Sequence, residues 1–230
     1  MSGADKISIT VCGDGGCGKS SITLRLVRSQ WTHEYDPTIE DSYSVTRIVD
    51  GKPYFLSLTD TAGQEEYRGL WAASNLQSDA FLLVYDITNS ASLDALTYFM
   101  QMIEMESDRR TDEGEVPPVK IAAGNKCDLK EERMISSQQG LEWARARGCG
   151  FMETSAREMV NIEETFALIV RRVVEARQLH KSGDAHPTLH HAGQSFSTTP
   201  ALTASEKKEL DSNHGGDSTK KSFWSRLKCW

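Results

Sequence analysis

Short apolar runs alternate with amphipathic stretches between residues 7 and 179 of the chain. The apolar runs have the length and composition of buried strands. They lie at 7–12, 55–58, 80–85 and 119–123, with a weaker one at 150–153. The stretches with apolar residues at helical spacing lie at 19–30, 92–106, 136–147 and 162–179. This alternation predicts an α/β domain with helices on both faces of a mostly parallel sheet.

One pair of predicted strands differs from the rest. Residues 44–49 and 53–58 flank Asp50-Gly51, a dipeptide typical of tight hairpin turns. One strand is therefore expected to run antiparallel at the edge of the sheet. With it, the sheet has six strands.

The last predicted helix closes the domain. Asn161 followed by Glu164 is typical of a helix N-cap. The apolar positions of this helix indicate core packing. They are Ile162, Phe166, Ile169, Val170 and Val173. Further back, residues 107–118 are dense in charges and end in Pro117-Pro118, which predicts an exposed loop.

The composition changes after the last helix, so the chain is divided into a domain at 1–180, a linker at 181–219 and a tail at 220–230. The linker is rich in Ser, Thr, Gly, His and Asp without a sustained apolar period, which predicts disorder. Its His186 and the pair His190-His191 suggest either metal binding or, more simply, solvated side chains.

A glycine-rich stretch stands between the first predicted strand and the first predicted helix. Its spacing is that of a phosphate-binding loop, or P-loop. Its residues are Gly13, Asp14, Gly15, Gly16, Cys17, Gly18, Lys19 and Ser20. Backbone N–H groups of such a loop and the start of the next helix form an anion site. Lys19 is expected to reach the outer phosphates and Ser20 to ligate Mg²⁺, so the stretch predicts a nucleoside triphosphate site.

Two downstream segments are expected to complete the phosphate end of this site. Asp60 ends a predicted strand, where a carboxylate can hold the Mg²⁺ shell. After it, Gly63 can offer an N–H to a γ-phosphate and Gln64 can orient a water. Thr38, between the first helix and the hairpin, can reach both Mg²⁺ and γ-phosphate. Taken alone, each segment is equally consistent with an ordinary turn.

Two further motifs point to the base. In Asn125-Lys126-Cys127-Asp128, the Asp128 carboxylate can accept two N–H groups of guanine that adenine lacks. The Lys126 stem can lie along the base. The motif Thr154-Ser155-Ala156-Arg157 can offer a backbone N–H to guanine O6. These loops follow strand ends, where open α/β sheets bind ligands.

Together these motifs resemble those of the Ras family of small GTPases, over about residues 5–180. Residues 35–43 are similar to its switch I and effector segment, 60–67 to its switch II, and 125–128 to its guanine motif. The resemblance implies a single P-loop G domain that binds GTP and GDP with Mg²⁺ and hydrolyses GTP slowly. It also implies a guanine nucleotide exchange factor, a GTPase-activating protein and Ras-type effectors as partners.

The resemblance also implies roles for single residues. Catalytic roles fall on Gln64, Lys19 and Thr38. Metal ligation falls on Ser20, Thr38 and Asp60. The nucleotide contacts are Gly13, Asp14, Gly15, Gly16, Cys17, Gly18, Lys19, Ser20, Ser21, Trp31, Tyr35, Pro37, Thr38, Asp60, Ala62, Gly63, Asn125, Lys126, Asp128, Ser155, Ala156 and Arg157. Effector contacts are Ile39, Glu40, Asp41, Ser42 and Tyr43.

Two features depart from the family pattern or limit the activity. Cys17 replaces the usual valine, and either buried packing or a redox-sensitive thiol would follow. No arginine stands where it would stabilise the transition state in cis, so hydrolysis is expected to depend on a partner.

Two other classes of protein are alternatives to a GTPase switch: a catalytically inactive GTP-binding scaffold and a metabolic P-loop kinase. Asp128 disfavours the kinase, because it suits guanine.

Composition bears on compartment and partners. The chain has 230 residues and a net charge of −7, which argues against nucleic acid as a partner. Its five cysteines have no metal-like pair spacing. No signal peptide or membrane-length apolar run is recognised, so we expect a reducing, cytosolic setting.

The tail at 220–230 interleaves basic and aromatic residues. Cys229 is next to last, which does not match a prenylation box. The pattern suits anionic lipids of the inner leaflet and is similar to the Rit-like branch of Ras relatives. The expected location is the cytoplasmic face of the plasma membrane, with a cytosolic pool. A solvated chain end and S-acylation of Cys229 are the alternatives.

Overall fold

A computed structural model of the chain describes residues 4–28, 40–61 and 76–183, all within one compact unit, Met1–Ala185. The elements are β1 (Asp5–Gly13), α1 (Lys19–Arg28), β2 (Glu40–Val49), β3 (Lys52–Thr61), β4 (Ala80–Asp86), α3 (Ser90–Asp112), β5 (Val119–Asn125), the 3₁₀ helix η2 (Lys130–Glu132), α4 (Ser137–Ala146), β6 (Gly150–Glu153) and α5 (Ile162–Ser182). The predicted linker and tail from residue 184 onward lie outside the described residues.

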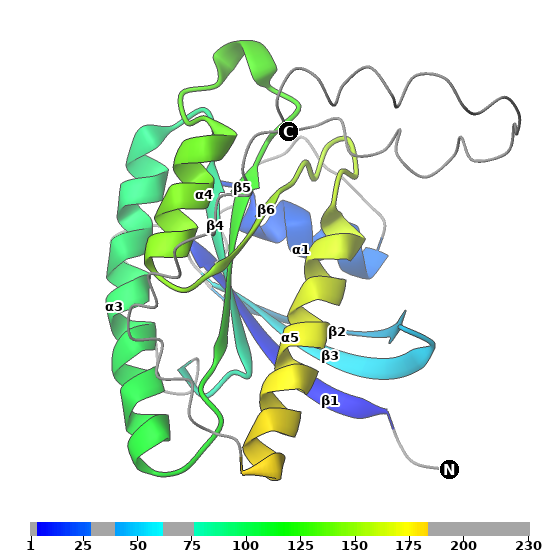
Figure 1. The fold of residues 1–230 in the computed structure, drawn as a ribbon. Helices are drawn as coiled ribbons and strands as arrows, with labels where there is room; N and C mark the ends of the chain where they lie inside the picture. The colour runs from blue at the N-terminus through cyan, green and yellow to red at the C-terminus, as the bar shows by residue number, and fades with distance from the viewer. Residues whose placement is uncertain (1–3, 29–39, 62–75, 184–230) are drawn as a thin grey trace, which may run out of the picture. The chain divides into compact units, whose positions relative to one another are not determined.

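The strands form one six-stranded sheet in the order β2-β3-β1-β4-β5-β6 (Figure 1). Among these described strands, only β2 and β3 pair antiparallel; the other neighbours are parallel. The predicted mixed sheet with one antiparallel edge strand is therefore confirmed. Because β1, β3, β4, β5 and β6 run the same way, their carboxyl ends and the loops that follow meet at one edge of the sheet.

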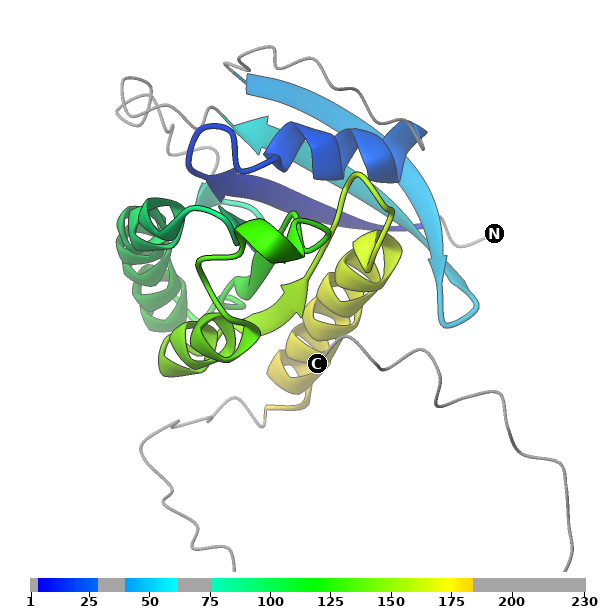
Figure 2. The same ribbon diagram turned by 90° about the horizontal axis from the view of Figure 1, so that it is seen from above.

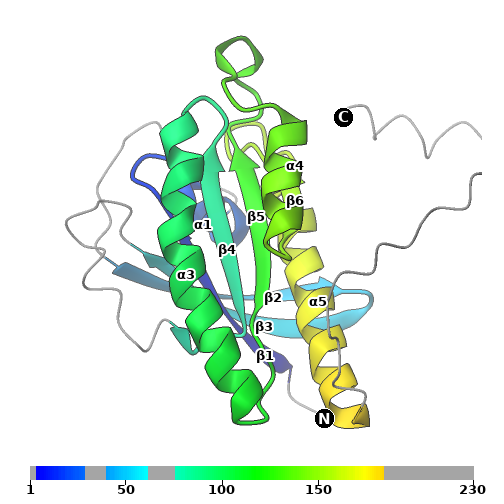
Figure 3. The same cartoon turned by 60° about the vertical axis from the view of Figure 1, so that its left-hand side comes forward.

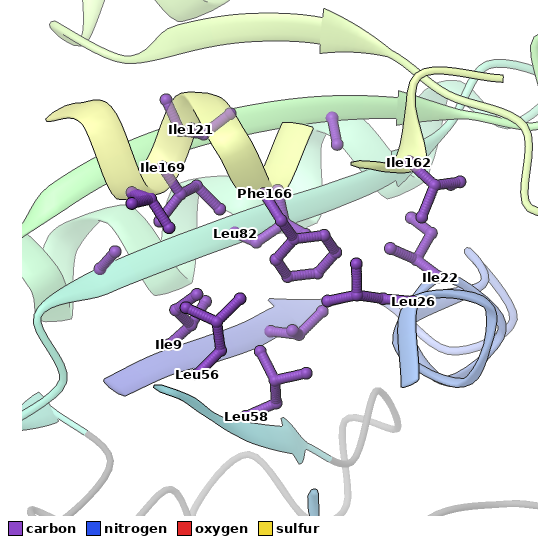
Figure 4. Close-up of a cluster of buried hydrophobic side chains, with 14 of the residues drawn as sticks. Ile9, Ile22, Leu26, Leu56, Leu58, Leu82, Ile121, Ile162, Phe166 and Ile169 are labelled. Atoms are coloured by element: carbon purple, nitrogen blue, oxygen red, sulfur yellow. The ribbon is translucent and has the colours of Figure 1, made fainter. Parts of the chain in front are cut away.

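Helices cover both faces of the sheet, as predicted (Figures 2 and 3). Alternate strand residues divide between two buried clusters, because successive side chains point to opposite faces. Leu82 and Val84 of β4 join a cluster with α1 and α5, whereas Leu83 and Tyr85 join one with α3. In the first cluster, Phe166 of α5 lies over the sheet among apolar side chains of β1, β3, β4 and α1 (Figure 4).

The hairpin turn between β2 and β3 has the predicted geometry. Asp50 and Gly51 both have positive φ, +50° and +77°. Two successive positive φ values give a two-residue turn whose twist matches that of the flanking strands. The Arg171 guanidinium of α5 pairs with Asp50 at 2.8 Å.

Helix α3 is longer than predicted, and the prediction of an exposed loop at 107–118 is wrong for its first part. The helix continues to Asp112. Arg110 and Glu106 form a buried ion pair one turn apart, and Arg109 pairs with Glu106 and Glu113. Such i,i+3 and i,i+4 pairs stabilise a helix, so charge density here indicates a continued helix rather than a loop.

The predicted side-chain cap of α5 is also wrong. Asn161 has left-handed backbone geometry, φ +53°, and its side chain makes no capping bond to the described first turn of the helix. Its Nδ2 instead donates to the Glu153 carbonyl at 2.8 Å. Helix α5 still begins at Ile162, but it ends at Ser182 rather than 179, followed by Gly183 at φ +75°. No helix among the described residues is long and apolar enough to cross a bilayer.

Candidate functional site

The glycine-rich loop joins the end of β1 to the start of α1, as predicted. Gly13 and Gly18 have φ of +147° and +94°, values that side chains rarely tolerate. A Cβ at Gly13 would collide with the Val84 carbonyl oxygen, and one at Gly18 with the Asn125 side chain. Glycine is therefore required at both positions by neighbouring strands. The loop also contains Asp14, Gly15, Gly16 and Cys17.

Lys19 crosses the loop from the first turn of α1. Its Nζ donates to the Asp14 carbonyl at 2.9 Å, and the residue is only 6% exposed. This places a positive charge against the backbone of the loop, on the same helix turn as Ser20 and Ser21. The start of the helix and the ammonium group together favour an anion at the loop.

Cys17 is packed inside the loop. Its side chain is 1% exposed and belongs to the core cluster with α1 and α5. Burial raises the pKa of the Cys17 thiol, which disfavours the reactive thiolate. Of the two interpretations of Cys17, the structure supports buried packing.

Asp60 is the penultimate residue of β3, opposite Val11 near the end of β1, and is completely buried. Neither of its carboxylate oxygens has a hydrogen-bond partner of ordinary geometry among the described residues. Burial raises the pKa of this carboxyl to about 6, while Ser20 and Lys19 oppose the rise. A buried carboxylate is costly unless it is well paired or binds a cation. With the Ser20 hydroxyl nearby, the site therefore fits a divalent metal ion.

Asn125, at the end of β5, connects the two ends of the site. Its Nδ2 donates to the Cys17 carbonyl at 2.8 Å. Its Oδ1 accepts from the Thr154 hydroxyl at 3.2 Å and more weakly from the Ala156 N–H at 3.4 Å. One buried amide thus holds the phosphate loop against the loop after β6. The Ala156 N–H, a candidate for guanine O6, faces Asn125 in this structure.

Lys126 and Asp128 are each held by one partner. The Lys126 Nζ pairs with Asp86 Oδ2 at 2.6 Å, and Lys126 has φ +64°. The Ser155 hydroxyl donates to Asp128 Oδ1 at 2.6 Å, which leaves Oδ2 for another donor. Both side chains are thus fixed at the same edge as Asn125.

Two residues of this edge are absent from the sequence prediction. Asp86 ends β4, so an acidic residue at a strand end was the available signal. Arg25 of α1 donates to the carbonyls of Ala156 and Arg157, both at 2.9 Å. No local pattern indicates this contact, because it joins residues far apart in the sequence. The side chain of Arg157 itself is half exposed.

The predicted effector segment begins the edge strand β2. Asp41 and Ser42 are exposed, and Tyr43 donates to Asp41 Oδ2 at 3.2 Å. The Arg28 guanidinium lies 5.7 Å from the centre of the Tyr43 ring. The other predicted residues lie outside the described residues. They are Trp31, Tyr35, Pro37, Thr38, Ile39, Ala62, Gly63 and Gln64, with the side chain of Glu40.

Comparisons with known proteins cover the strands and loops that build this site. The sequence model of the Ras family matches residues 8–175. A "Ras-like protein" of Laccaria bicolor is 41% identical over 165 residues, which are 72% of this chain and 76% of that protein.

Proposed function

The chain belongs to the Ras family of small GTPases, and on that basis we propose that it is a GTP/GDP switch in signal transduction. Asn125 is the observation that supports this most directly. It joins the phosphate loop, through Cys17, to the loop after β6, through Thr154. A base bound near Asp128 and a triphosphate bound at Lys19 would therefore share one rigid edge.

Guanine is the base that this edge suits. Asp128 is oriented by Ser155 and keeps one carboxylate oxygen for N–H donors. Guanine offers N1–H and N2–H at its edge, whereas adenine would leave that oxygen without a partner. Competition of unlabelled GTP and ATP against a fluorescent GDP analogue measures this preference, and we expect GTP alone to compete at micromolar concentrations.

Mg²⁺ is the metal that the phosphate end suits. Ser20 and Asp60 would hold it, together with Thr38, which is outside the described residues. Mg²⁺ takes few protein ligands and keeps several waters, so one carboxylate with hydroxyl groups is a suitable set. When bound, the ion would offset the negative charge of the phosphates.

Hydrolysis needs a positioned water and stabilisation of charge more than covalent chemistry. In this proposal Lys19 contributes charge to the phosphates and Gln64 orients the attacking water. Release of the γ-phosphate frees Thr38 and Gly63, so effectors at residues 39–43 distinguish the GTP form from the GDP form. An exchange factor and a GTPase-activating protein would set the balance between the two forms.

Single-turnover hydrolysis of GTP by the full chain with Mg²⁺ tests the proposal. We expect slow wild-type turnover and a loss of roughly tenfold or more in Gln64→Leu, because the water is no longer oriented. Gln101→Leu, at an exposed position of α3, is the matched control and should hydrolyse as wild type. Tight GTP binding without turnover would instead identify an inactive GTP-binding scaffold.

The proposed site of action is the inner face of the plasma membrane, with a cytosolic pool. The tail has four cations, Lys220, Lys221, Arg226 and Lys228, and no acidic residue, in a chain whose net charge is −7. Anionic lipid headgroups attract such a segment, and its aromatic residues favour the interface.

A further inference from the structure

Arg25 connects the helix of the phosphate loop to the loop after β6, a contact to which the proposed function assigns no role. It lies on α1, the helix that begins at Lys19. Its Nε donates to the Ala156 carbonyl and its Nη2 to the Arg157 carbonyl, both at 2.9 Å. Arginine presents its donors in a planar fork, so one side chain fixes two successive carbonyls in a single geometry.

The carbonyl of Ala156 lies where the loop after β6 turns. This loop spans residues 154–161. Ser155 and Val160 close it by exchanging two backbone hydrogen bonds, at 3.1 and 3.0 Å. Ala156 follows directly after this closure and is only 4% exposed. A buried carbonyl without a partner is costly, so the turn should shift when Arg25 is removed, until water or another donor reaches this oxygen.

Ala156 is held at both of its backbone polar groups, but unequally. Its N–H donates to Asn125 Oδ1 at 3.4 Å, and the same oxygen accepts from the Thr154 hydroxyl at 3.2 Å. Its carbonyl accepts from Arg25 at 2.9 Å. The longer and weaker hydrogen bond is the one made by the N–H. An incoming acceptor can therefore take over this N–H while Arg25 keeps the residue in place.

Helix α1 gives Arg25 a fixed starting point. Ile22 and Leu26, on either side of it in the sequence, are 0% and 1% exposed and belong to the core cluster with α5. The Thr23 hydroxyl is also buried and donates to the Lys19 carbonyl at 3.0 Å. The position of the loop after β6 is thus tied to the same helix that begins at the phosphate loop.

We propose that Arg25 is a positioning residue for guanine recognition, which holds the Ala156 N–H where it meets O6 of the base. This rests on the proposed function, in which guanine binds at this edge. Arg25 acts through the backbone of Ala156 rather than by touching the nucleotide. A site built to donate to O6 discriminates against a base with a poorer acceptor there, and it loses that discrimination when the donor is displaced.

The test compares GDP with 6-thio-GDP, in which sulfur replaces O6 while N1–H and N2–H remain. Sulfur is a weak hydrogen-bond acceptor. Competition of each nucleotide against a fluorescent GDP analogue, on the full chain with Mg²⁺, gives the ratio of their affinities. We expect the wild-type chain to prefer GDP. Arg25→Ala should bind GDP roughly tenfold more weakly, on the scale of one hydrogen bond, and should lose most of that preference.

Two results of this comparison would overturn the proposal. One is equal affinity of the wild-type chain for GDP and 6-thio-GDP, since no donor would then be reading O6. The other is a loss by the same factor for both nucleotides in Arg25→Ala. General loosening of the domain would weaken the two equally, whereas a displaced N–H weakens GDP more.

Arg28→Ala is the matched control. Arg28 is the last residue of the same helix, is exposed, and has its guanidinium over the Tyr43 ring. This variant should bind both nucleotides as wild type, and losses equal to those of Arg25→Ala would overturn the proposal. Arg25→Lys keeps the charge but not the fork, so it should show a smaller loss of the same kind. If Arg25→Ala does not fold, a wild-type preference for GDP in Arg25→Lys would overturn the proposal.

Hydrogen exchange gives a readout that does not depend on affinity. In the GDP form with Mg²⁺, peptides covering residues 154–161 should exchange several-fold faster in Arg25→Ala than in Arg28→Ala. Wild-type exchange together with a wild-type preference for GDP in Arg25→Ala would overturn the role of Arg25 and leave the proposed function intact. No binding of GTP or GDP by the wild-type chain would overturn the proposed function, and this role with it.

Discussion

Asn125 illustrates how much of the site depends on one side chain. Its amide uses both its donor and its acceptor to hold the phosphate loop and the loop after β6 together. Gly18 is required for the same reason, because any side chain there would meet this amide. A residue can therefore be essential to nucleotide binding through what it positions as well as through what it contacts.

Glu106 gives a prediction with a defined pH dependence. Hydrogen bonds from Arg109, and to a lesser extent Arg110, lower its pKa from an ordinary 4.5 to about 2, against the opposing effect of burial. A lowered carboxyl pKa contributes stability above the unfolded value, and the contribution is lost as pH falls through the folded one. Urea unfolding of Glu106→Gln should show a loss of about 3 kcal/mol at pH 7, because Arg110 stays buried without its partner.

The same measurement repeated at lower pH checks the cause. The difference between wild type and Glu106→Gln should shrink once the pH falls below about 4.5 and approach zero near 2. Glu115→Gln is the control, since its pair with Arg109 is 3.4 Å long and exposed, and it should change stability far less than Glu106→Gln. A difference that stays constant with pH would contradict the assignment.

Among the secondary-structure elements, the β2–β3 hairpin is specified by its turn. Gly51 has φ +77°, and apart from its own chain neighbours no atom of the described residues lies within 4 Å of the place that a Cβ would take, so its requirement is purely conformational. Gly51→Ala should therefore lower the free energy of unfolding by about 1 kcal/mol, measured by urea denaturation. Arg171→Ala removes only an exposed ion pair and should cost less than that. Equal stability of Gly51→Ala and wild type would show that the turn tolerates a side chain.

Two helices show where a local pattern is ambiguous. The charges after Glu106 fit an exposed loop and a charged helix equally well. The hydrogen bond from Arg110 to the Leu76 carbonyl favours the helix. Asn161 fits an N-cap and a left-handed turn residue equally well, and the Glu153 carbonyl selects the turn. In both cases a partner distant in sequence decides between two local options.

For the molecule as a whole, the membrane proposal concerns the tail rather than the described domain. Changing Lys220, Lys221, Arg226 and Lys228 to Ala should lower the binding constant of the full chain for phosphatidylserine vesicles by roughly two to three orders of magnitude. Flotation at a series of lipid concentrations measures this constant. The expected size of the loss follows from about 1 kcal/mol for each cation near the surface. Alanine at Lys207 and Lys208, in the linker, is the matched control.

Ionic strength separates the electrostatic part of this binding from the rest. Binding of the wild-type chain should weaken as salt rises, because charges are screened beyond about 10 Å at 0.1 M. Equal recovery of the four-alanine variant would contradict electrostatic anchoring and would favour acylation of Cys229 or aromatic insertion.

The order of the strands, the mixed sheet and the place of the glycine-rich loop between β1 and α1 could be predicted from the order of residues. Apolar periodicity is a local property, and residues such as Gly13 to Ser20 act through backbone geometry that their own order dictates. Because parallel strands share a carboxyl edge, the motifs at Asp60, Asn125 and Ser155 were also predicted to meet.

The way in which these loops hold one another became visible only in three dimensions. The contacts of Asn125 with Cys17, of Lys126 with Asp86, and of Arg25 with Ala156 join residues that are separate in the sequence. The same holds for Arg110 and Leu76. Each depends on which strands and helices are neighbours, and no spacing along the chain encodes the direction of a side chain toward a distant carbonyl.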